Sequence, residues 1–418
     1  MCTRHLAFSF VDFWPSLWRR RENAPARAKM ECLNCLVPGL AGDEEFGKLD
    51  YGPMRLADIR RRQEWPSEVM TSPLTIEGEA YRLRYSFVKQ RGYYADDPEK
   101  ANQDSMAILP NLSETVPFAV GVFDGHGEYG DDCSGSVADN IGAELAQGAQ
   151  RGHAQDIPAA LRATYSSLNA TLHASDDFDD EVSGTTAVTL IFADGMLWTA
   201  NVGDSRAIIA QSSNDGSLVP RALSNDHSPF DKLERARIRR QGGEIASVRQ
   251  RRNGEMVPDD FWDVDLTNRD LAQKFPAPRV WSADRSVEGP ACAFTRSLGD
   301  AMGERLGVIS EPEITCKELR KHDRFVCVAS DGVWEFLSNE DVCAIVQRFD
   351  EPLAACRAVV AEAYRLWMKY DGRGTDDITI VLLFIEPASG DANGAAPSSP
   401  GVPRITRGRG DSFRTVSA

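Results

Sequence analysis

The sequence lacks long apolar runs, excess positive charge and internal repeats, and the first two of these absences each argue against a class of protein. Among its 418 residues no apolar run approaches the ~20 residues needed to cross a bilayer, so we expect no membrane-spanning segment. The formal net charge of -16 argues against nucleic acid as a partner, because phosphate backbones are bound mainly by Lys and Arg. No internal repeat is visible in the sequence.

The nine cysteines also lack the dense spacing of a secreted disulfide scaffold. We therefore expect a reducing, intracellular compartment, the cytoplasm or the nucleus. Cys32 and Cys35 form a single CxxC pair, but a structural zinc site needs a second pair of ligands nearby, and none follows. The pair is interpreted as a chance spacing or as a reactive surface thiol.

Both ends of the chain differ in composition from the middle. The first 40 residues mix aromatic side chains with the basic run Arg19–Arg21, which suits an organelle-targeting segment, an interfacial anchor or a poorly ordered extension. Residues 388–418 are rich in Gly, Pro, Ser and Ala, and cannot bury enough apolar surface to order themselves. We expect a flexible C-terminal tail there.

Between the ends, apolar runs of strand length alternate with longer patterns of helical spacing. The predicted strands are Met106–Leu109, Pro117–Phe123, Thr186–Ala193, Met196–Val202, Ala207–Ala210, Phe325–Ala329 and Ile378–Ile385. The predicted helices are Ser134–Gly148, Ile157–His173, Lys232–Gln241, Asn339–Gln347 and Pro352–Lys369. Many strands follow one another directly, which favours a largely antiparallel sheet core with helices packed outside.

Aspartates stand at the ends of four predicted strands. Asp124 and Asp331 follow buried apolar runs, while Asp104 and Asp376 precede them. In an antiparallel sheet the start of one strand lies beside the end of its neighbour, so these four positions can meet at one edge. Each aspartate alone is more often a turn former or a helix cap. Four together would repel one another, and binding of hard cations relieves that repulsion.

Several motifs around these residues resemble the metal-dependent protein phosphatases of type 2C. The matching blocks, in order, are Asn102–Ser105, Phe123–Gly127, Ser183–Thr186, Asn201–Arg206, Leu223–His227, Ala293–Asp300, Ala329–Trp334 and Gly374–Thr379. The resemblance extends over residues 75–387, and implies a catalytic domain there, after an N-terminal extension of residues 1–74 that is partly disordered or targeting. The implied fold is α+β, a four-layer α/β/β/α sandwich with two largely antiparallel sheets.

The resemblance also implies a role for each site residue. Asp124 would bridge two Mg²⁺ or Mn²⁺ ions, and His126 would be the general acid that protonates the leaving alkoxide. The other implied ligands are the Gly125 carbonyl, Asp331 and Asp376 directly, Asp104 and Gln103 through coordinated water, and Asp204 with Glu335 at a third, weaker ion. Two such ions activate a water molecule and clamp the phosphoryl oxygens.

The sequence departs from the common family pattern at two positions. Gln103 stands where many members have Glu, and Glu99 stands where many have an Arg that binds the substrate phosphate. A guanidinium binds phosphate with two hydrogen bonds, whereas Glu repels it. We hypothesise that Lys100 or Arg91 supplies the phosphate contact instead.

The stretch Ala246–Glu288 interrupts the pattern and has the length of an inserted lobe. It occupies the region of the family's flap beside the active site. Its side chains Arg249, Arg251, Arg252, Phe261 and Trp262 are expected either to contact substrate or only to pack against the sandwich.

The sequence thus predicts a monomeric hydrolase that removes phosphate from phosphoserine and phosphothreonine in protein substrates. The first alternative is a pseudophosphatase that keeps the fold and serves as a binding module. The second is a metal-dependent phosphoesterase acting on nucleotides or nucleic acid, which the acidic charge opposes.

Overall fold

The computed structural model describes residues 61–388 and 405–407, apart from 96, 98, 114–115, 149–155, 215, 255–261, 264–276, 288 and 371–373. The Arg19–Arg21 segment and the Cys32 and Cys35 pair lie outside the described residues. Within them, no helix is long and apolar enough to span a bilayer.

One sheet contains eight strands, and all the pairings in it are antiparallel. Its order is β11-β10-β17-β19-β3-β1-β20, with β2 also paired to β3. The strands are β1 (Gln63–Pro66), β2 (Met70–Ile76), β3 (Glu79–Gln90), β10 (Arg206–Ser212), β11 (Leu218–Ala222), β17 (Asp323–Ala329), β19 (Ile378–Pro387) and β20 (Ile405–Arg407).

The second sheet has seven antiparallel strands in the order β15-β7-β6-β8-β9-β16, with β5 paired to β6. Its strands are β5 (Asp104–Pro110), β6 (Phe118–His126), β7 (Gly184–Thr185), β8 (Ala187–Ala193), β9 (Met196–Val202), β15 (Leu298–Gly299) and β16 (Glu313–Glu318). Strand β8 is buried along its whole length, because alternate side chains enter two different cores. The strand therefore lacks a solvated face.

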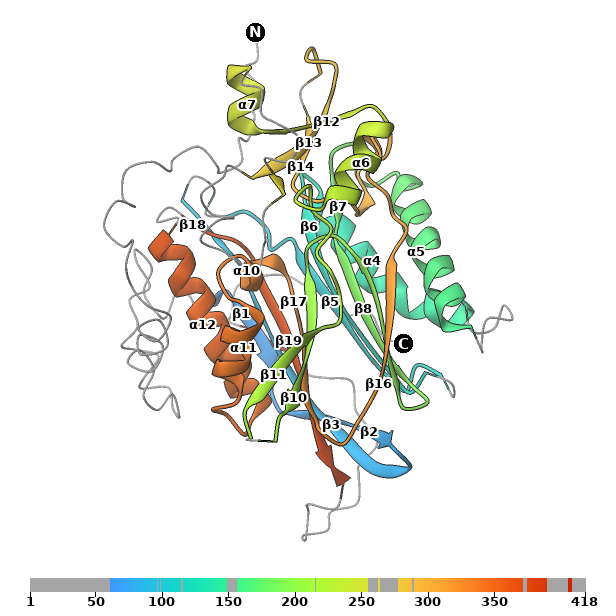
Figure 1. The fold of residues 1–418 in the computed structure, drawn as a ribbon, viewed down its shortest axis with the longest axis vertical. Coiled ribbons are helices and arrows are strands. Elements are labelled where there is room, and N and C mark those ends of the chain that lie inside the picture. Colours follow the sequence, from blue (N-terminus) through green and yellow to red (C-terminus); the bar gives the residue numbers. More distant parts are fainter. Residues whose placement is uncertain are drawn as a thin grey trace.

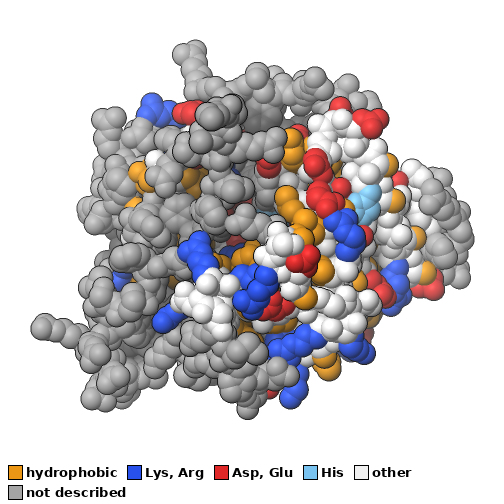
Figure 2. All heavy atoms as spheres, turned by 90° about the horizontal axis from the view of Figure 1, so that it is seen from above, with side chains coloured by type: hydrophobic (Ala, Val, Ile, Leu, Met, Phe, Trp, Pro, Cys, Tyr) orange, Lys and Arg blue, Asp and Glu red, His pale blue; other side chains and the backbone are white. Residues whose placement is uncertain are grey.

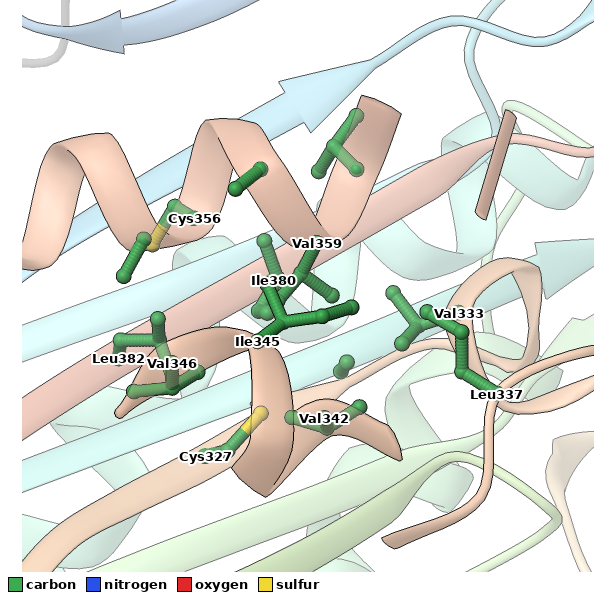
Figure 3. Close-up of a cluster of buried hydrophobic side chains, with 14 of the residues drawn as sticks. Cys327, Val333, Leu337, Val342, Ile345, Val346, Cys356, Val359, Ile380 and Leu382 are labelled. Atoms are coloured by element: carbon green, nitrogen blue, oxygen red, sulfur yellow. The ribbon is translucent and has the colours of Figure 1, made fainter. Parts of the chain in front are cut away.

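The two sheets pack face to face, with helices outside each (Figure 1). Helices α4 (Gly130–Gly148) and α5 (Ile157–His173) cover the second sheet. Helices α11 (Asn339–Val346) and α12 (Pro352–Tyr370) cover the first, where Ile345 and Val359 meet Ile380 of β19 (Figure 3). This arrangement confirms the predicted four-layer α/β/β/α sandwich.

A small third sheet, β12 (Gly243–Ser247), β13 (Pro278–Ser282) and β14 (Pro290–Cys292), lies at the upper end in Figure 1. Helices α6 (Lys232–Arg240) and α7 (Val248–Asn253) accompany it. Trp262 is buried edge-on against Phe230, and Arg235 forms a salt bridge with Asp263. The predicted lobe therefore contributes β13 and α7 to this part of the fold, and Trp262 packs against Phe230, which precedes α6; Phe261 lies outside the described residues.

The folded sandwich begins before residue 75, the expected start of the domain. Strands β1 and β2 both pair with β3, which the sequence analysis did not predict. In β3, Tyr81, Leu83 and Tyr85 enter the core between the sheets, while Arg82 and Arg84 face outward and pair with Glu386. This alternation of apolar and charged residues identifies a half-buried strand. Strand β20 lies within the segment expected to be a flexible tail.

Candidate active site

Strand pairing places two of the predicted aspartates opposite each other. Asp104 begins β5 and Asp124 lies near the end of β6, and the two are Cα partners in the ladder. Asp104 is fully buried, and its Oδ2 accepts a hydrogen bond from Ser330 Oγ at 2.7 Å. Its other oxygen, Oδ1, is buried with no hydrogen-bond partner among the described residues. A buried, unpaired carboxylate oxygen is costly unless a proton or a cation neutralises it.

The other two aspartates come from the opposite sheet. Asp331 begins the short helix α10 (Asp331–Trp334) after β17, and Asp376 lies between β18 (Gly374–Thr375) and β19. Strand β18 pairs with β4 (Tyr93–Tyr94), and the Tyr94 hydroxyl donates to Asp376 Oδ1 at 2.8 Å. Ser330, which bonds Asp104, also donates its backbone N–H to the Thr379 carbonyl at 3.0 Å. Ser330 therefore links the two pairs of aspartates.

The neighbouring Asp377 has a structural role that the sequence analysis did not assign. It is buried, and its carboxylate accepts from the backbone N–H groups of Gly92 at 2.6 Å and Gln103 at 2.8 Å. Gly92 follows β3 of the first sheet, whereas Gln103 precedes β5 of the second. Asp377 therefore joins the two sheets beside the site, and the position of Asp376 depends on it.

Crowding raises the pKa values of these carboxyl groups. Burial first, and then the charges of neighbouring aspartates, raise the pKa of Asp124 and of Asp331 well above the usual value. For the same reasons the pKa of Asp104 rises to about 7 and that of Asp377 to about 6. The charge of Asp376 acts on all four of these groups. The carboxylates are thus close enough to compete for protons or cations.

The position after Asp124 in β6 needs glycine because backbone from neighbouring segments surrounds it. A Cβ on Gly125 would lie 2.0 Å from the Gly130 carbonyl oxygen and 2.5 Å from that of Gln103. The Gly125 N–H donates to the Gln103 carbonyl at 3.0 Å, which holds the end of β6 against the residue that precedes β5. The Gln103 amide donates to the Gly127 carbonyl at 2.7 Å. Gln103, predicted to hold a metal-bound water, therefore also anchors the backbone where β6 ends.

His126 contacts a residue to which the sequence analysis gave no role. Its Nε2 lies 2.7 Å from Oδ2 of Asp300, which is buried and also accepts a hydrogen bond from Ser297 Oγ at 2.6 Å. The Phe294 ring packs 4.3 Å from the imidazole, measured between centroids. Asp300 closes the block Ala293–Asp300, which carried the resemblance, but nothing in that block shows that its carboxylate reaches His126.

The two residues predicted at a third ion border the same cluster. Burial raises the pKa of Asp204 to about 6, with a further contribution from Asp226. Glu335, an exposed residue directly after α10, and Asp204 both act on Asp331 through their charges. Asp204 and Glu335 therefore extend the acidic cluster beyond Asp331.

Of the two cations predicted to contact phosphate, Lys100 reaches the cluster. Its ammonium lies 4.1 Å from the centroid of the Tyr94 ring, and its charge acts on Asp377. Arg91 instead points Nη1 at the Lys100 carbonyl, 3.5 Å away. Figure 2 views the molecule from above, and on the described part of that face Lys and Arg lie among Asp and Glu.

The donor chemistry fits hard divalent cations, which prefer carboxylate and carbonyl oxygen. No three His, Cys, Asp or Glu side chains in the described ranges already stand in a metal-coordinating arrangement. Instead Asp376 accepts a hydrogen bond from Tyr94 and Asp104 accepts one from Ser330, while Asp331 lies close enough to Asp124 for its charge to raise the pKa of Asp124. The buried Oδ1 of Asp104, which has no hydrogen-bond partner among the described residues, is the oxygen most available to a cation.

Comparisons with known proteins identify one family. The pattern described as "Protein phosphatase 2C" matches residues 96–366. "Probable protein phosphatase 2C 35" of Arabidopsis thaliana is 37% identical over 313 residues, covering 74% of this chain and 86% of that protein. "Probable protein phosphatase 2C 48" of Oryza sativa subsp. japonica is 30% identical over 379 residues, covering 85% and 98%.

A solved structure has the same fold. The crystal structure of serine-threonine phosphatase 2C from Toxoplasma gondii superposes with a TM-score of 0.58 at 18% sequence identity. The match covers 76% of this chain and 99% of that one. At this identity the likeness concerns the fold alone.

Proposed function

Since the chain belongs to the protein phosphatase 2C family and is a serine/threonine protein phosphatase, we propose that it hydrolyses phosphoserine and phosphothreonine at a centre of two Mg²⁺ or Mn²⁺ ions. The family as a whole is metal-dependent. The observation that carries the proposal is the convergence of Asp104, Asp124, Asp331 and Asp376 from both sheets, where burial and neighbouring charges raise the pKa values of Asp104, Asp124 and Asp331.

Each of these residues has a proposed place around the ions. Asp124 and the Gly125 carbonyl would bind at the end of β6, and Asp331 and Asp376 would complete the site from the first sheet. Asp104 and Gln103 would hold coordinated water, and Asp204 with Glu335 would hold a third, weaker ion. The bound ions would lower the pKa of a coordinated water molecule, so that it can lose a proton near neutral pH and attack phosphorus.

His126 has the proposed role of proton donor to the leaving oxygen. A serine alkoxide is strongly basic, and a positioned imidazole lowers the barrier to its departure. Because Nε2 is bonded to Asp300, Nδ1 is the ring nitrogen left to carry the proton. The buried Asp300 carboxylate, itself held by Ser297, would orient the ring. On the opposite side, Lys100 remains a proposed contact for phosphate.

The test is phosphate release from a phosphoserine peptide by the full chain, with and without Mn²⁺, for the wild type and Asp124→Asn. We expect release only with Mn²⁺, and a loss of at least a hundredfold in kcat/KM in the variant, because the substitution removes a ligand charge. The matched control is Asp194→Asn, the same change at an exposed turn residue with φ 48°. That variant should match the wild type.

Two results would contradict the proposal. Release that is independent of metal would remove the role of the ions. No release by the wild-type chain under any metal condition would favour the pseudophosphatase, in which the departures at Glu99 and Gln103 mark a lost activity.

A further inference from the structure

Besides Lys100, a second cation, Arg279 of the small third sheet, lies close enough to the acidic cluster to interact with its charges. Arg279 lies on β13, opposite Ala246 of β12, and is half-buried. Burial lowers the pKa of its guanidinium, while the charges of Asp204, Glu335 and Asp331 oppose that effect. The charge of Arg279 in turn lowers the pKa of Asp204, against the larger effect of burial, which raises it. The arginine therefore lies on the Asp204 side of the site, whereas Lys100 acts on Asp377.

The Arg279 side chain uses only part of its hydrogen-bonding capacity. Nη1 donates to the Ala291 carbonyl at 2.8 Å, whereas Nε is buried with no partner within the described ranges. Nε and Nη2 form one planar edge of the guanidinium, and this edge is the one that binds the two oxygens of a carboxylate or phosphate. A buried, unpaired Nε–H is costly, so an acceptor is expected there.

The backbone holds this edge in place. Ala291 has φ 61°, in the left-handed region that costs a residue with a β-carbon some strain. Ala291 lies at the irregularity between Pro290 and Cys292, which pair with Trp281 and Val280 of β13, and its carbonyl accepts from Nη1. A flexible surface arginine would not need such support.

From this geometry we propose that Arg279 binds the phosphoryl group of the substrate through its Nε and Nη2 edge, in place of the arginine that is replaced by Glu99. A dianionic phosphoryl group matches the guanidinium in charge and in the spacing of its oxygens. The inference rests on the proposed function, because it places the phosphoryl group between the carboxylate-bound ions and β13.

The test is calorimetric binding of inorganic phosphate to the full chain with Mg²⁺, alongside KM for a phosphoserine peptide. We expect Arg279→Ala to weaken phosphate binding and raise KM by roughly tenfold or more, as for other charged hydrogen bonds. Arg279→Gln should have a similar effect while keeping a donor for the Ala291 carbonyl. Should Arg279→Ala fail to fold, Arg279→Gln decides.

The matched control is Arg285→Ala, in the loop between β13 and β14, where the side chain is exposed and pairs with Glu244. It should bind phosphate as the wild type does. Wild-type phosphate binding in an Arg279 variant, or no phosphate binding by the metal-loaded wild type, would overturn the proposal. Weakened phosphate binding without any peptide turnover by the wild type would leave Arg279 in place and contradict the hydrolytic function alone.

Discussion

At the residue scale, the pairing of His126 with Asp300 separates two possible roles for the carboxylate. As part of the catalytic machinery, Asp300 matters only when the leaving oxygen needs a proton. As a structural group, it matters for every substrate. Its φ of 54° lies in the left-handed region, where Asn is as acceptable as Asp. Asp300→Asn is therefore a conservative test of the charge.

We predict that Asp300→Asn lowers kcat for a phosphoserine peptide by about a hundredfold, the lower end of the usual contribution of a general acid. Turnover of p-nitrophenyl phosphate should fall much less, because its leaving group departs without a proton. The double variant His126→Gln/Asp300→Asn should have a kcat no lower than that of His126→Gln alone. An equal loss on both substrates would show that Asp300 is merely structural.

At this scale the sequence motifs predicted the candidate ligands but not the residues that support them. Asp104, Asp124, Asp331 and Asp376 stand at strand ends, and strand ends can be read from apolar runs. The contact between His126 and Asp300 joins positions 174 residues apart. No local pattern encodes such a contact, and the same holds for the bonds that Asp377 accepts from Gly92 and Gln103.

At the element scale, the turn from β6 into α4 decides whether the site can form. Gly125 is enclosed by backbone from Gly130 and Gln103, and backbone atoms cannot move aside as a flexible side chain can. Gly135, in the same α4, offers a contrast, since a Cβ there meets nothing within 4 Å. Substitution of Gly125 therefore tests the close approach of neighbouring backbone, whereas substitution of Gly135 tests helix propensity.

We predict that Gly125→Ala lowers the melting temperature and abolishes Mn²⁺-dependent activity, because the added methyl group must displace α4 or β5. Gly135→Ala should instead raise stability by up to about 1 kcal/mol, the usual gain from replacing an exposed helical glycine. Thermal unfolding and phosphate release measure both variants. A Gly125→Ala protein with wild-type stability and activity would contradict the described packing.

At this scale, an element could be predicted where its apolar residues form a long or regular pattern. Long apolar runs such as β8 and β19 were located to within a few residues, as was α5. Strand β3 was missed because charged Arg82 and Arg84 alternate with its apolar residues. The small sheet was expected only as a lobe, since its short strands are separated by a long insertion.

At the scale of the whole molecule, the sandwich brings both sheets to one acidic site. The ladder of β5 and β6 supplies one pair of aspartates, and β17 and β19 supply the other. Layer order could be predicted because the helices lie outside two antiparallel sheets. The position of the third sheet relative to the site could not be predicted, because it depends on long-range contacts such as that between Arg235 and Asp263.

The raised pKa values fix the sign of a coupling between metal and protons. Below about pH 7 a large share of the Asp104 carboxyl groups carries a proton, and burial and neighbouring charges raise the pKa of Asp124 and Asp331 as well. Metal ligands must be deprotonated, so binding must release protons. The release should be larger at pH 6 than at pH 8, where fewer protons remain.

Calorimetric titration of the full chain with Mn²⁺ at pH 6 and pH 8, in buffers of different ionisation enthalpy, tests the central claim most directly. We predict two ions per chain, net proton release at pH 6 that shrinks at pH 8, and the loss of binding in Asp124→Asn but not in Asp194→Asn. Absence of saturable Mn²⁺ binding, or binding that Asp124→Asn leaves intact, would contradict the claim that these carboxylates form the metal centre.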